Sequence, residues 1–159
     1  MNKEQLFVKM ALSAWETHIG RAGELLDSLS DEQILNEIAP NKNRGVYLVG
    51  HLIAIHDAMN DILGVGKRSH VDLDKAFVQN PDNSRLGMPD VSVLRQYWKD
   101  VHQNLKEALQ QLKPEEWFMR HTHMTDEDFA REPHRNKLNV LINRTNHLAY
   151  HLGQLRLLK

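Results

Sequence analysis

Two histidines near the end of the chain are spaced so that they could bind one metal ion. His147 and His151 are four residues apart in NHLAYHLGQL, and a helix with about 100° per residue places such a pair one turn apart on the same side. A third histidine, His51, lies in GHLIAIHDAM near the centre of another apolar helical stripe, next to Gly50, which permits a close neighbour. We therefore expect His51, His147 and His151 to converge in the interior and to bind one divalent metal ion.

Three neutral imidazoles with a fourth position open are the ligand set of a reactive zinc-type site rather than of a closed structural one. Imidazole also suits nickel, copper and iron, and we expect zinc or nickel. The alternative is that the helical pair faces solvent or is a hydrogen-bonded core pair. Each buried imidazole has one donor and one acceptor to satisfy, and a shared metal would satisfy the three together.

The chain has ten histidines, and the other seven are expected to have simpler roles. His56 is predicted to be a neighbour of the site rather than a ligand. Two residues of an irregular segment, His121 and His123, could reach the mouth of the site. Even for these two, a surface position is the first expectation. The same holds for the remaining four histidines: His18, His70, His102 and His134.

Carboxylates are missing where a zinc protease would need one. The residue after the first histidine of the pair is Leu148 rather than the glutamate of HExxH, so the sequence argues against a protease. From Lys137 to Lys159 there is no Asp or Glu, and a general base would have to come from Asp57, Asp61 or a loop. Polar residues on the same helix could support the ligands or bind substrate: Asn143, Asn146, Tyr150 and Gln154.

Helical periodicity predicts the elements that carry these histidines. The fold class is all-α, a four-helix bundle with long crossover connections that allow a topology other than simple up-down-up-down. The irregular connections are residues 64–90, with one helical turn around Leu73 to Val78, and 113–136, with a short helix starting at Thr125. Ser30 and Gln33 could form a capping box. The four long helices are expected at about Lys3 to Ser28, Arg44 to Leu63, Asp90 to Leu112, and Lys137 to the C-terminus.

The first helix has apolar residues on more than one side, so its buried face must be chosen. Leu6, Met10, Ala14, Thr17 and Leu25 lie near one face, which we expect to pack inward. Trp15, Ile19 and Leu26 are expected to widen that face.

Composition limits the function classes. A chain of 159 residues fits one domain, 1–159. A net charge of -1 with both signs dispersed argues against nucleic acid or an anionic membrane as partner. No cysteine is present, so any thiol must come from outside. With no apolar run long enough for a membrane span, we expect a cytoplasmic protein, and a homodimer through an exposed helix face is plausible.

The two histidine segments and the long crossover between them resemble the DinB-like family of metal-dependent four-helix-bundle proteins. The resemblance covers nearly the whole chain, and it places the family's metal triad on His51, His147 and His151. It also includes the string that continues to Gly153 and Gln154. Related proteins include transferases that use the thiols bacillithiol or mycothiol.

Three functions remain open from the sequence. In the first, which ranks highest, the metal activates a low-molecular-weight thiol that attacks a small electrophile, which needs no protein base. In the second, the metal activates water for hydrolysis. In the third, the protein is a stress-response module that binds a metal or small ligand without turnover.

Overall fold

The protein is built from helices, and the computed structural model describes residues 1–84 and 86–159. Within these residues no β-strand forms, which confirms the all-α prediction. The long helices are α1 (Lys3–Ser28), α3 (Gly45–Asp57) with its continuation α4 (Met59–Ile62), α6 (Val91–Gln111) and α8 (Lys137–Leu155).

Shorter helices fill the connections, and two of the predicted starts are confirmed. Ser30 and Gln33 form the capping box that begins α2, and Thr125 caps α7 by accepting from the Asp128 backbone N–H. The short α-helices are α2 (Asp31–Leu35), α5 (Asp74–Phe77) and α7 (Asp126–Arg131), and the 3₁₀ turns are η1 (Val71–Leu73), η2 (Asp82–Ser84), η3 (Pro114–Phe118) and η4 (Arg156–Leu158).

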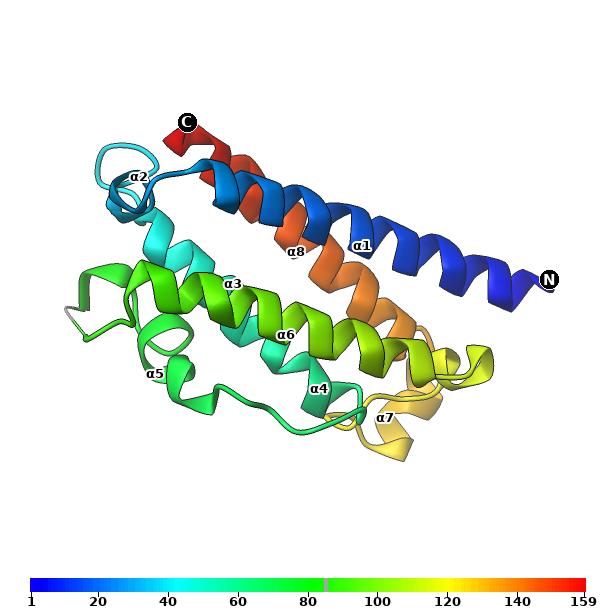
Figure 1. Ribbon diagram of the computed structural model, residues 1–159. Coiled ribbons are helices and arrows are strands. Elements are labelled where there is room, and N and C mark those ends of the chain that lie inside the picture. The colour runs from blue at the N-terminus through cyan, green and yellow to red at the C-terminus, as the bar shows by residue number, and fades with distance from the viewer. Residues whose placement is uncertain (85) are drawn as a thin grey trace.

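The bundle pairs helices that run in the same direction. Figure 1 shows α1 and α8 running side by side towards the end where the C-terminus lies, while α3 and α6 run together in the opposite direction. Parallel neighbours cannot be joined by a tight turn, since the chain must return along the bundle before the second helix begins. This is why a crossover as long as residues 63–90 separates α4 from α6. The crossover also contains α5, which packs against α3.

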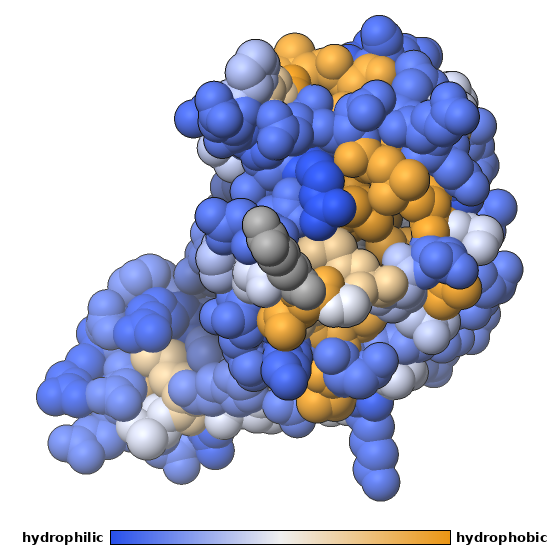
Figure 2. All heavy atoms as spheres, turned by 90° about the vertical axis from the view of Figure 1, so that its left-hand side faces the viewer, coloured by the Kyte–Doolittle hydropathy of each residue, from blue (hydrophilic) through white to orange (hydrophobic). Residues whose placement is uncertain are grey.

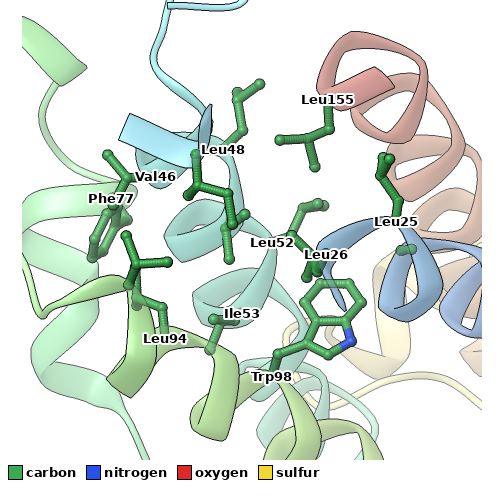
Figure 3. Close-up of a cluster of buried hydrophobic side chains, with 14 of the residues drawn as sticks. Leu25, Leu26, Val46, Leu48, Leu52, Ile53, Phe77, Leu94, Trp98 and Leu155 are labelled. Carbon is green, nitrogen blue, oxygen red and sulfur yellow. The ribbon is translucent and has the colours of Figure 1, made fainter. Parts of the chain in front are cut away.

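The core joins all of these elements. In Figure 3 apolar side chains from α1, α3, α5, α6 and α8 meet in one cluster, which includes Leu26, Leu52, Phe77, Trp98 and Leu155. Leu52 and Phe77 are fully buried. Because α5 contributes Phe77 to this core, the crossover is packed against α3 rather than loose beside it.

The buried face of α1 differs from the predicted one. Leu6 and Met10 are 44 % and 59 % exposed, and Ala14 and Thr17 are exposed as well. Trp15, expected only to widen the face, is buried and anchors a second apolar cluster. The reason is the apolar area that each choice removes from water: burying the indole of Trp15 removes far more than burying Ala14 and Thr17.

The end of the bundle near the C-terminus has a mainly polar surface (Figure 2). Figure 2 views the end of the bundle that carries α2 and the C-terminus, and hydrophobic residues show there as patches between hydrophilic ones. Leu35 of α2 and Leu157 of η4 are among the exposed leucines of the chain. Across residues 1–84 and 86–159, none of the helices combines the length and apolar character that crossing a membrane requires.

Candidate metal centre

The three predicted histidines come together where α3 contacts α8. His147 Nε2 lies 3.2 Å from His51 Nε2 and 3.1 Å from His151 Nε2. One ring nitrogen of each residue lies within 4.8 Å of the others, and the group could hold a metal ion. The rings stand at 70° to 89° to one another, so they meet by their edges rather than by their faces. The site is partly buried.

Hydrogen bonds at the far side of two rings fix which nitrogen faces the centre. His51 Nδ1 lies 2.7 Å from the Phe77 carbonyl oxygen, and His151 Nδ1 lies 2.6 Å from Gln154 Oε1. An oxygen of this type can only accept, so both Nδ1 atoms carry the proton in the neutral rings. Both Nε2 atoms therefore present lone pairs to His147.

His147 alone cannot satisfy two lone pairs well. A neutral imidazole has one N–H, and His147 Nδ1 is buried with no hydrogen-bond partner in the described part of the chain. If the proton is on Nδ1, three lone pairs face one another. A cation shared by the three nitrogens removes this conflict. Two zinc–nitrogen bonds of about 2.0–2.1 Å in tetrahedral geometry separate the nitrogens by roughly 3.3 Å, close to the two separations observed, so the residues fit the group.

Burial keeps these rings neutral. Removal from water lowers the pKa of His51 and of His151. For His147, burial, with the neighbouring histidines and Arg144 adding to it, lowers the pKa to about 4. Metal binding requires neutral rings, and near pH 7 none of the three histidines has to lose a second proton before it can bind an ion.

The crossover orients His51, and a glycine makes this possible. A Cβ atom built on Gly50 would overlap the Phe77 ring, so only glycine allows α5 to pack this close to α3. That packing brings the Phe77 carbonyl to His51. Tyr47 stacks on His51 with parallel rings and donates its hydroxyl to the Asn80 carbonyl. The sequence indicated a close approach at Gly50, and the structure shows that the crossover makes it.

The two carboxylates considered as general bases are engaged elsewhere. Asp57 is 1 % exposed and accepts from the backbone N–H groups of Ser69 and His70 and from the Arg68 side chain. Asp61 pairs with His123 at 3.1 Å near the end of α4. Asp57 therefore anchors the crossover. His123 is outside the group of three histidines.

A second histidine pair lies deeper in the bundle. His56 Nδ1 is 2.6 Å from His102 Nε2, and His102 Nδ1 is 2.7 Å from the Trp98 carbonyl oxygen. His102 was expected at the surface, but it is 5 % exposed. The expectation was wrong because both ring nitrogens of His102 have partners, one from α3 and one from α6, which the sequence of one helix does not show.

Of the polar residues proposed around the ligands, Gln154 has the clearest contact. It accepts from His151 and donates to the Tyr150 hydroxyl at 3.2 Å. Asn143 and Asn146 are exposed. Sequence reasoning missed the Phe77 carbonyl, since a backbone group carries no residue signal. It also missed Arg144, whose position one turn before His147 was the available sign.

The comparison with known protein families assigns the chain. Residues 14–155 match the DinB superfamily, a match that includes all three histidines of the site. The protein is therefore a helical bundle of the DinB superfamily with a three-histidine group. Among curated proteins no match was found.

Proposed function

We propose that the protein binds one divalent metal ion, zinc or nickel, through His51, His147 and His151, and transfers a low-molecular-weight thiol to a small electrophile. The observation that carries the proposal is the convergence of the Nε2 atoms of three neutral histidines. Such a site has a strong preference for an anionic ligand, because the three imidazoles contribute no negative charge.

When bound, a divalent ion supplies positive charge that favours the thiolate form of a thiol at neutral pH. The thiol proton leaves to solvent, so no protein base is needed. The sulfur then forms a bond to the electrophilic carbon, and the leaving group departs with its electron pair. The role of the chain is to hold the ligands: Phe77 and Gln154 orient two of the three rings.

Hydrolysis is the weaker candidate. Metal-assisted hydrolysis is aided by a carboxylate that can take a proton from water, and Asp57 and Asp61 both have other partners.

A cytoplasmic location and a homodimer also stay predictions. For the latter, the exposed face of α1 around Leu6, Phe7 and Met10 supplies apolar area.

The first experiment is elemental analysis of the purified, untagged protein beside His51→Ala and His151→Ala. We expect about one equivalent of zinc or nickel in the wild type, much less in both variants, and circular dichroism that shows both variants folded. The next step is turnover of a thiol with an electrophile such as 1-chloro-2,4-dinitrobenzene. Metal bound without turnover for any thiol would favour non-catalytic binding, and no metal in the wild type would refute the proposal.

A further inference from the structure

Arg144 differs from the other partly buried arginines of the protein. In the described part of the chain, four others are partly buried, and each pairs with a carboxylate: Arg44 with Asp82, Arg68 with Asp74, Arg95 with Asp31 and Arg120 with Asp126. Arg144 has no ion pair and no hydrogen bond to any described residue, and its Nε is buried without a partner.

Leaving a guanidinium partly out of water without a counter-charge costs free energy. Burial lowers the pKa of Arg144 from its ordinary value, although the group stays charged at neutral pH. The C-terminal segment that carries Arg144 supplies no counter-charge, since residues 137–159 contain no Asp or Glu. A cost of this kind is expected where a charge serves a ligand rather than the fold.

The position of Arg144 directs it to the metal centre. It lies three residues before His147 and seven before His151, which puts the three on one face of α8. Side chains on a helix lean towards its N-terminus, so the His147 ring covers the turn that carries Arg144. The positive charge of Arg144 also contributes to the lowered pKa of His51 and His147. The guanidinium is thus within electrostatic reach of both ligand helices.

We propose that Arg144 binds a carboxylate on the thiol substrate, so that the site selects thiols that carry a second negative group. The inference rests on the proposed function. A divalent ion on three neutral ligands and an unpaired guanidinium together call for two anionic groups, and a thiolate supplies only one. The planar fork of arginine suits a carboxylate, which it can bind through two parallel hydrogen bonds.

Among the described residues, two buried ring nitrogens near Arg144 also lack a hydrogen bond, His56 Nε2 and His147 Nδ1, and the charge of Arg144 acts on both rings. Each of them can accept at most one N–H, whereas a guanidinium has five. The remaining donors of Arg144 stay available to a ligand.

The test compares two thiols of equal length, 3-mercaptopropionate and 3-mercapto-1-propanol, by calorimetric titration of the zinc-loaded protein. We expect the wild type to bind the carboxylate thiol at least about tenfold more tightly. In Arg144→Gln this preference should fall to near one, through weaker binding of the carboxylate thiol alone. Arg21→Gln, which makes the same charge change at an exposed residue of α1, should keep the wild-type preference.

The outcomes separate this inference from the function on which it rests. Equal affinity of the wild type for the two thiols, or a preference that survives in Arg144→Gln, overturns the role of Arg144 while thiol binding stands. A loss of zinc or of affinity for both thiols in Arg144→Gln shows a structural role instead. Failure of the zinc-loaded wild type to bind either thiol overturns both proposals. We also expect Arg144→Gln to melt no lower than the wild type, because an unpaired charge is removed.

Discussion

Helix α3 carries two histidines that belong to clusters of opposite character. The pair formed by His56 and His102 is a directed chain, in which His56 donates to His102 and His102 donates to the Trp98 carbonyl. In the triad, His51 and His151 donate their Nδ1–H groups to oxygens outside the cluster. The lone pairs of their Nε2 atoms therefore face the centre of the cluster. Both clusters have ring nitrogens about as close as hydrogen bonds allow. The comparison teaches that the direction of the protons, rather than proximity, separates a metal site from a core contact.

The largest expected difference between the clusters is their response to zinc. Adding zinc at about 100 times its dissociation constant should stabilise the metal-free wild type by about 2.7 kcal/mol, and thermal denaturation measures this as a higher midpoint. His102→Ala should retain the zinc-induced shift, whereas His147→Ala should lose it. Loss of the zinc-induced shift in His102→Ala would mean that zinc binds at the pair of His56 and His102 rather than at the triad.

The pair should matter more for stability without metal. His102→Ala leaves His56 Nδ1 and the Trp98 carbonyl without their buried partner and opens a cavity in the core. We expect the free energy of unfolding to fall by roughly 2–3 kcal/mol, as measured by urea denaturation in the presence of a chelator. His134→Ala, at an exposed position, is the matched control and should change it little. If both variants behave alike, the pair contributes no net stability.

Orientation of the ligands should have a smaller effect on the triad. Gln154→Leu removes the acceptor that fixes the His151 ring, and loss of such a partner commonly weakens metal binding by about 10-fold to 100-fold. A zinc titration against a competing chelator measures the dissociation constant. Asn143→Leu, on the same helix but outside the triad contacts, should leave it unchanged. Equal zinc affinity in the wild type and Gln154→Leu would mean that packing alone orients His151.

Acid should affect both clusters in the same direction. Burial lowers the pKa of His102 and of His147 to about 4, while the unfolded chain binds protons near the ordinary histidine pKa of about 6.5. Between these values the unfolded state holds more protons, so the metal-free protein loses stability as pH falls from about 6.5 to 4.

Each fully buried histidine contributes at most about 1.4 kcal/mol per pH unit, and His147, being partly exposed, contributes less. Urea midpoints at pH 7, 5.5 and 4.5 should therefore decline, and His102→Ala should show a shallower decline. A flat profile in the wild type would contradict the neutral assignment of these rings.

The sequence by itself determined the helices and the three candidate ligands. Helix caps are local, so Ser30 and Thr125 mark helix starts that the structure repeats. The four-residue spacing of His147 and His151 is a property of one helix, and the apolar stripe around His51 turns that residue inward. The DinB resemblance joined the two segments, and the family match over residues 14–155 supports it.

Only the tertiary structure decided how these helices face one another. The inward face of α1 depends on which neighbours pack against it, so Trp15 is buried while Leu6 and Met10 are exposed. The Phe77 carbonyl reaches His51, 26 positions earlier in the chain, because the crossover packs against Gly50. The burial of His102 and the lack of a partner for Arg144 among the described residues have the same origin. Hydrogen-bond partners and counter-charges are supplied from distant parts of the chain, and periodicity within one helix carries no information about them.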